Sequence, residues 1–229
     1  MSEPRLIEVR RNVLKQNDVI ARALRDQFRA AGVFVVSLVS SPGSGKTAFL
    51  ERTLTQLQPR FRVAALVGDL ATDNDAARLA RSKAPVKQIT TGTLCHLEAA
   101  MVQTALQDWD LHQLDFLFIE DVGNLVCDGA WDLGEDLRVV LISVTEGEDK
   151  PQKYPAIFKS ADVVVVTKLD LADAVGFDAE ALRTNIEAVQ PGLPVFELSA
   201  WTGRGVHEYV SFLERCRLER TLARLDAGL

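Results

Sequence analysis

The stretch VFVVSLVSSPGSGKTAFL, residues 33–50, decides the fold class of this chain. Its first part, residues 33–39, is a continuous apolar run rich in β-branched residues, as expected for a strand buried on both faces. Its second part, SSPGSGKT at residues 40–47, matches the eight-residue phosphate-binding loop, except that Ser40 stands at the usual first glycine. A helical pattern follows the loop. Because strand, glycine-rich loop and helix occur in the required order, we expect a P-loop nucleotide-binding domain.

Each part of this loop has a chemical role. Gly43 and Gly45 let backbone N–H groups curve around phosphate oxygens. Lys46 can reach the β- and γ-phosphates, and Thr47 can bind Mg²⁺ through its hydroxyl. A Gly/Ser-rich turn with an incidental lysine is the alternative, which the intact GKT sequence disfavours. The residues predicted to contact nucleotide in this loop are Ser41, Gly43, Ser44, Gly45, Lys46, Thr47 and Ala48.

Six further apolar runs alternate with helical stretches along the chain. They span residues 61–67, 86–89, 114–119, 137–144, 162–167 and 193–198. Such strands, separated by helices, predict an α/β fold with a mostly parallel seven-stranded sheet and helices on both faces. Surface helices are expected over residues 178–190 and 206–225, and an amphipathic helix over about residues 6–31 precedes the sheet. A single domain, residues 1–229, accounts for the whole chain.

Carboxylates follow two of these strands, at the edge where ligands of parallel sheets gather. Strand 114–119 is followed by Glu120, and Gly123 lies three residues later, which resembles a Walker-B switch. The carboxylate can hold Mg²⁺ through water, while the Gly123 N–H can bond a γ-phosphate and release it after hydrolysis.

The sequence GDLATDND, residues 68–75, supplies further carboxylates after another strand. Any one of them can instead cap the following helix. Asp75 is a candidate for positioning the attacking water. The predicted Mg²⁺ ligands are Thr47, Asp69, Asp75 and Glu120, and the predicted catalytic residues are Lys46, Thr47, Asp75, Glu120 and Gly123.

Two turns indicate which base is bound. Strand 162–167 leads into TKLD, residues 167–170, which differs from the guanine-reading N-K-x-D only by its threonine. Asp170 can accept the N1 and N2 hydrogens of guanine, which adenine does not offer, and Lys168 can lie over the base. Ser199 and Ala200 follow the last strand, where small GTPases carry a turn that supports the base. A capping aspartate beside a solvated lysine is the alternative, but the two turns together favour GTP.

Composition excludes several other classes of protein. The 229 residues include 32 acidic and 26 basic side chains, a net charge of −6 that opposes binding to nucleic acid. No apolar run approaches the roughly 18 residues that span a bilayer, and the N-terminal residues lack the apolar core of a signal peptide. We therefore expect a cytoplasmic protein without nucleic-acid or membrane partners. In a reducing compartment the three cysteines are expected to be packing residues, reactive thiols or metal ligands, not a disulfide framework.

A possible metal site involves two of the cysteines. Cys95 and His96 are adjacent, and Cys127 lies four residues beyond Gly123. Thiolate and imidazole suit Zn²⁺ and Ni²⁺, and three ligands leave a fourth position for water, a partner's ligand or a second subunit. Buried thiols beside a hydrogen-bonded histidine would give the same pattern. Cys216, on the last predicted helix, is interpreted as a packing residue.

The ordered set of motifs resembles the HypB family of hydrogenase-maturation GTPases, of the SIMIBI class. The resemblance runs from about residue 12 to the end, through SSPGSGKT, GDLATDND, TGTLCHLEAAMV, EDVGNLVC, DLGED and SVTEGEDKPQKYP. It implies Mg²⁺-dependent GTP hydrolysis, a homodimer, and assistance in inserting nickel into nickel-iron hydrogenase. It also implies a Ni²⁺ or Zn²⁺ site at Cys95, His96 and Cys127 near the dimer interface. The implied partners are a nickel-delivery accessory protein and the hydrogenase large-subunit precursor.

The chain departs from the family pattern at three positions. Asp121 stands where asparagine is usual, Asp128 where proline is usual, and Thr167 where asparagine or serine is usual. The N-terminal cysteine-rich motif and the histidine-rich tract of some members are also missing from this sequence, so their high-affinity metal store is not expected here. Segment 146–158, EGEDKPQKYPAIF, is expected to line the nucleotide pocket or the subunit interface through Lys150 and Lys153, with a solvated loop as the alternative.

The short tether between Gly123 and Cys127 suggests a mechanism in which closing the switch on a γ-phosphate moves a metal ligand. Two other functions are weighed against it. One is a zinc-stabilised docking scaffold that binds GTP with little turnover. The other is a related metallochaperone GTPase for urease or a cobalamin enzyme, which the CHLEA and GNLVC segments disfavour.

Overall fold

The computed structural model describes residues 4–69, 78–127 and 131–226, with side chains from residue 13 onward. Seven strands form one sheet in the order β3-β2-β4-β1-β5-β6-β7. The strands are β1 (Phe34–Ser40), β2 (Val63–Asp69), β3 (Val86–Thr90), β4 (Phe116–Glu120), β5 (Leu137–Ser143), β6 (Val163–Thr167) and β7 (Val195–Glu197). Every neighbouring pair is parallel, so the mostly parallel sheet predicted from sequence is entirely parallel. Strand β1 lies at its centre, which places the P-loop in the middle of the carboxyl edge.

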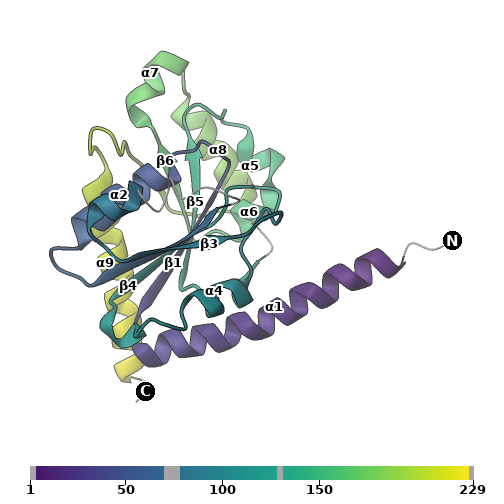
Figure 1. The fold of residues 1–229 in the computed structure, drawn as a ribbon. Helices are drawn as coiled ribbons and strands as arrows, with labels where there is room; N and C mark the ends of the chain where they lie inside the picture. Colours follow the sequence, from purple (N-terminus) through teal and green to yellow (C-terminus); the bar gives the residue numbers. More distant parts are fainter. Residues whose placement is uncertain (1–3, 70–77, 128–130, 227–229) are drawn as a thin grey trace.

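Helices cover both faces of this sheet (Figure 1). They are α1 (Pro4–Ala31), α2 (Lys46–Leu57), α4 (Ala99–Ala105), α5 (Lys150–Lys153), α6 (Pro155–Lys159), α7 (Ala172–Val175), α8 (Ala179–Val189) and α9 (Val206–Asp226). Short 3₁₀ turns are η1 (Ala80–Ser82), η2 (Leu111–Gln113) and η4 (Leu169–Leu171).

The two faces alternate along each strand, as the period of two requires. In β1, Val36 and Leu38 pack with α2 and α9, whereas Val35 faces α1 and α4. On the same face as α1 and α4, the part of the sheet formed by β5 and β6 is covered by α6 and α8. Cys216 of α9 is half-buried and packs against the core between the sheet and helices α2 and α9, as predicted.

Helix α1 extends beyond the face of the sheet on which it packs (Figure 1). Ala21, Leu24 and Phe28 are fully buried against the sheet and α4, while the N-terminal part projects beyond the domain (Figure 1). The predicted span of about 6–31 agrees with the observed helix, Pro4–Ala31. None of the helices in the described parts of the chain is long and apolar enough to cross a membrane.

The proline-punctuated segment after β5 is more ordered than a solvated loop. Residues Pro151 and Pro155 stand in the first turns of α5 and α6, where a missing N–H breaks no helical hydrogen bond. Lys150 pairs with Glu146 at 3.6 Å, and Lys153 pairs with Asp149. The two prolines therefore start short helices instead of preventing them.

Candidate nucleotide and metal site

The P-loop joins the carboxyl end of β1 to the N-terminus of α2. Gly43 and Gly45 have φ of 75° and 93°, in the left-handed region that glycine adopts without strain. Lys46 Nζ donates to Ser40 Oγ at 2.9 Å, and Ser44 Oγ donates to the same oxygen at 2.6 Å. Ser40, the departure from the usual motif, is thus an internal acceptor that holds the loop, and all three side chains are buried.

The two central predicted Mg²⁺ ligands lie in contact. Thr47 Oγ1 donates to Glu120 Oε1 at 2.8 Å, and both residues are buried. Asp69 ends β2 beside them, because Val67 is in register with Glu120. Hydroxyl and carboxylate oxygens are the ligands that Mg²⁺ prefers, so these residues fit that ion. Asp75 lies outside the described residues.

Gly123 passes directly against the P-loop lysine. Its φ is 100°, and a Cβ at this position would overlap Lys46 Nζ. Glycine therefore fits this backbone conformation beside the Lys46 side chain without strain or displacement. The predicted pairing of Gly123 with the phosphate site is consistent with this geometry.

Asp121 connects this segment to the loop that carries Cys95 and His96. Its Oδ1 accepts hydrogen bonds from Leu97 N and Val122 N, both at 2.8 Å, and only 1% of the residue is exposed. Burial raises the pKa of Asp121 to about 6, although the two N–H donors and the nearby Lys46 act in the opposite direction. Sequence reasoning noted Asp121 only as a departure from the family pattern and missed this bond.

The residues predicted to read the base meet the P-loop from the end of β6 and the loop after β7. Thr167 Oγ1 donates to the Ser44 carbonyl at 2.5 Å, and Lys168 Nζ donates to the Gly43 carbonyl at 2.6 Å. Ser199 Oγ donates to Asp170 Oδ1 at 2.5 Å, so this carboxylate is oriented although the residue is exposed. Thr167 therefore fixes the loop through its hydroxyl.

The remaining predicted nucleotide contacts lie at the same edge. Ser41 accepts at its carbonyl from Ser44 N, Ala48 is in the first turn of α2, and Ala200 follows Ser199. Ala48 and Ala200 also line one hollow beside Trp201.

The predicted transition-metal ligands converge. Sulfur and nitrogen atoms of Cys95, His96 and Cys127 all lie within 4.8 Å of one another. The expectation that the cysteines form no disulfide is wrong for one pair: Cys95 and Cys127 are bonded, with Cα atoms 6.4 Å apart. This Cα separation lies within the range that a disulfide spans. In the reduced form, two thiolates and an imidazole fit Ni²⁺ or Zn²⁺.

Burial and an aromatic ring fix the environment of His96. Burial lowers the pKa of His96, while the neighbouring Glu98 carboxylate, 3.6 Å from Nε2, acts to raise it. The lowered pKa favours neutral imidazole, the form that binds metals. The Trp131 ring stacks on the imidazole, with centroids 4.1 Å apart and planes 13° from parallel.

Comparison with known proteins decides the family. A model of the CobW/HypB/UreG nucleotide-binding domain matches residues 14–197. Hydrogenase maturation factor HypB of Azotobacter vinelandii is 45% identical over 227 residues, 99% of this chain and 75% of that relative. This chain belongs to the HypB family.

Solved HypB structures agree with this assignment. The crystal structure of HypB from Helicobacter pylori in complex with nickel has a TM-score of 0.84 and 38% identity, covering 89% of this chain and 96% of that one. HypB from Archaeoglobus fulgidus has a TM-score of 0.82 and 36% identity, covering 89% and 99%. The fold predicted from the P-loop and the parallel strands is thus confirmed.

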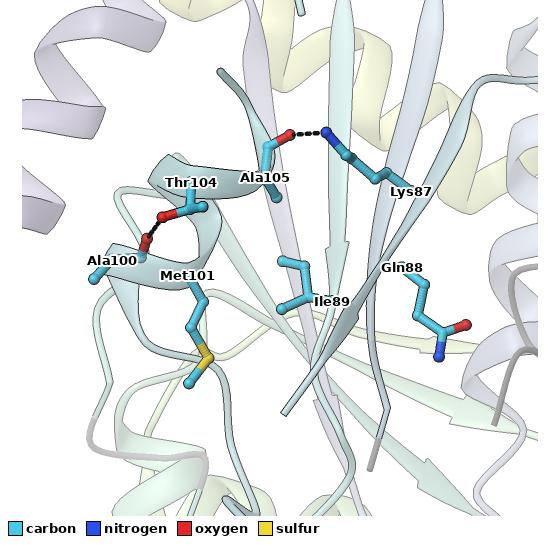
Figure 2. Close-up of a pocket in the computed structure, with 7 residues that line it drawn as sticks. All are labelled: Lys87, Gln88, Ile89, Ala100, Met101, Thr104 and Ala105. Atoms are coloured by element: carbon cyan, nitrogen blue, oxygen red, sulfur yellow. Dashed lines mark hydrogen bonds between the residues drawn. The ribbon is translucent and has the colours of Figure 1, made fainter. Parts of the chain in front are cut away.

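A separate groove of this HypB-family chain lies between β3 and α4 (Figure 2). Its volume is about 480 Å³, and Lys87 reaches across it to the Ala105 carbonyl at 2.9 Å. Its lining is Lys87, Gln88, Ile89, Ala100, Met101, Thr104 and Ala105. Among the lining residues that the structure describes, none carries a carboxylate, a thiol or an imidazole.

Proposed function

We propose that this chain is a GTP-hydrolysing metallochaperone that assists nickel insertion into the precursor of a nickel-iron hydrogenase large subunit. Two findings on relatives support the proposal: the curated relatives are named hydrogenase maturation factors, and one solved HypB is in complex with nickel. The observation that carries it is the continuity of residues 120–127, which run from the Thr47 contact of Glu120 to the cluster ligand Cys127.

Hydrolysis is assigned to the residues at the end of β1 and β4. Lys46 and the P-loop N–H groups neutralise and hold the phosphates, while Thr47 and Glu120 hold Mg²⁺. Bound Mg²⁺ supplies positive charge to the phosphate oxygens. The Gly123 N–H bonds the γ-phosphate, and loss of that phosphate frees the segment that follows.

Guanine is read by an oriented carboxylate. Ser199 donates to Asp170 Oδ1, which leaves the remaining lone pairs of the carboxylate free to accept N–H groups. Lys168 lies beside the P-loop because its Nζ is bonded to the Gly43 carbonyl. Base and phosphates are therefore held by one connected set of residues.

Nucleotide state is proposed to reach the metal through two connections. The first is covalent, because only three residues separate Gly123 from Cys127. The second is the Asp121 bond to Leu97 N, beside His96. A nucleotide can shift the protein between two conformations only if it contacts them differently. We expect these two connections to pass such a difference from the γ-phosphate to the metal ligands. The open fourth metal position suits a ligand from a second subunit or from a partner that delivers nickel.

The decisive experiment measures nickel and zinc binding in the reduced protein by competition with a chelating dye, with the dimer fraction read in parallel. Wild type is compared with a Cys95→Ala/Cys127→Ala variant, each with GDP and with a non-hydrolysable GTP analogue. Cys216→Ala, at a half-buried thiol outside the cluster, is the matched control. We expect binding to require both cluster cysteines and to change with nucleotide. Equal metal affinity in both nucleotide states would contradict the proposed coupling between nucleotide and metal binding.

A further inference from the structure

The loop that carries Cys95 and His96 is also held by a residue of α1. Asn17 lies on the inward face of this helix and is only 5% exposed. It is separated from both of its partners by more than 80 positions in sequence, so no local pattern marks it. A buried polar side chain at such a place requires specific partners.

The Asn17 amide uses both of its ends. Its Nδ2 donates to the Asp132 carbonyl at 2.8 Å, and its Oδ1 accepts from Ala99 N at 2.8 Å. The two partners, a carbonyl and an N–H, fix which end of the amide is which. A carboxylate could accept but not donate, and leucine could do neither, so this position needs an amide.

Each partner of Asn17 adjoins the environment of His96. Ala99 is the first residue of α4 and lies three positions after the histidine. Asp132 directly follows Trp131, whose ring stacks on the imidazole. Asn17 therefore joins the loop that carries the imidazole to the loop that carries the ring covering it.

Two further contacts join α1 to the loop that carries Asp132. Arg25, two turns along the helix, pairs with the Asp132 carboxylate at 2.6 Å. At Gly134 a Cβ would lie 2.8 Å from the Ala21 carbonyl, so this loop runs directly against the helix backbone. A displacement of α1 would thus be transmitted to the residues around His96.

We propose that Asn17 is a positioning residue for the metal site and that it makes α1 a mechanical part of that site. Its two hydrogen bonds set the orientation of His96 relative to Cys95 and Cys127, and hence the affinity for Ni²⁺ or Zn²⁺. The inference rests on the metal-binding part of the proposed function and not on GTP hydrolysis.

The test uses the full reduced chain and three variants. Asn17→Leu removes both bonds at similar volume, and Asn17→Asp keeps the acceptor but loses the donor. Gln16→Leu is the matched control, because Gln16 is an exposed amide on the same helix. Affinity for Ni²⁺ and Zn²⁺ is measured by chelator competition, and the geometry of the nickel site by its thiolate-to-metal charge-transfer absorption. Circular dichroism and GTP-analogue binding verify the fold.

We expect Asn17→Leu to weaken metal binding about 10-fold or more, as loss of residues that orient ligands does, and to alter the absorption band. Asn17→Asp should weaken binding less, because it keeps the acceptor for Ala99 N and its added negative charge favours a cation. The nucleotide affinity of both Asn17 variants should equal that of wild type. Gln16→Leu should bind metal and nucleotide as wild type does.

Wild-type affinity and an unaltered spectrum in a folded Asn17→Leu protein would overturn the proposal. Should that variant not fold, Asn17→Asp decides, and metal binding within twofold of wild type would count against the role of Asn17. If wild type binds metal but shows no dependence on nucleotide, the GTP coupling fails while the Asn17 comparison still stands.

Discussion

Gly123 passes directly against Lys46 of the P-loop and lies four residues before Cys127. Its φ of 100° and the predicted overlap of any Cβ with Lys46 Nζ mean that Gly123→Ala must displace the lysine or the segment. We expect GTP turnover to fall about 100-fold, comparable to losing one stabilising donor. Gly176→Ala is the control, because Gly176 also has positive φ but no atom within 4 Å of its Cβ position. Steady-state phosphate release checks this, and equal losses in both variants would implicate backbone strain instead.

A second prediction concerns the base. Asp170→Asn replaces a carboxylate with an amide that accepts one hydrogen bond and donates another, which matches xanthine instead of guanine. GTP affinity should fall about 100-fold while xanthosine triphosphate gains affinity. Turnover of bound xanthosine triphosphate should remain close to the wild-type rate with GTP, since the phosphate site is unaltered. Unchanged preference for GTP would show that Asp170 does not read the base.

Single residues divide into those the sequence could predict and those it could not. Glu120 ends β4, and Lys46 and Asp170 lie a few residues beyond the ends of β1 and β6, so local pattern and parallel topology were enough to place them at one edge. Asn17 and Trp131 act through contacts across long sequence distances, and nothing near them in the chain marks those contacts. The cysteine pair was predicted as a metal site, but its disulfide was not.

At the scale of elements, the ion pair that joins the start of β5 to α9 should make the stability of the fold depend on pH. Asp136, just before β5, pairs with Arg220 of α9 at 2.7 Å and accepts from Val35 N at 2.9 Å. Burial nevertheless raises the pKa of Asp136 above its ordinary value and lowers the pKa of Arg220. The folded chain therefore holds the Asp136 proton more tightly than the unfolded chain does. The stability this contributes is complete at low pH and is lost as pH rises through the folded pKa.

We expect the difference in free energy of unfolding between wild type and Asp136→Asn to decrease as pH rises from about 4 to 7. Urea unfolding across that range measures it. Asp115→Asn is the control of opposite sign: burial acts to raise the pKa of Asp115, but Arg62 and Arg217 lower it overall. Its contribution should be complete well above the ordinary pKa of aspartate and should decrease only as pH falls toward and below that value. A difference for Asp136 that grows with pH would contradict the raised pKa.

Helices and strands were largely predictable because their signals are local. Continuous apolar runs marked all seven strands, with ends shifted by one or two residues. Helices α5 and α6 were not predicted, because proline reads as a break in sequence although it is favourable in a helix's first turn. The packing of α1 on α4 and the sheet depends on which faces meet, which periodicity alone does not decide.

For the whole molecule, metal and nucleotide should act on stability as linked ligands. A ligand at 100 times its Kd adds about 2.7 kcal/mol, which raises the Tm of a chain this size by about 5–10 °C. We expect reduced wild type to show such shifts with Ni²⁺ and with a GTP analogue, and their combined shift to differ from the sum. Cys95→Ala/Cys127→Ala should keep only the nucleotide shift.

Without reductant, the Cys95–Cys127 disulfide removes both thiolates, so the Tm shift caused by metal should also disappear in wild type. Because coupling between two sites is reciprocal, the deviation from additivity, converted to free energy, must equal the free-energy change in metal binding caused by nucleotide. Strictly additive shifts would mean that the 120–127 segment holds both sites without linking them.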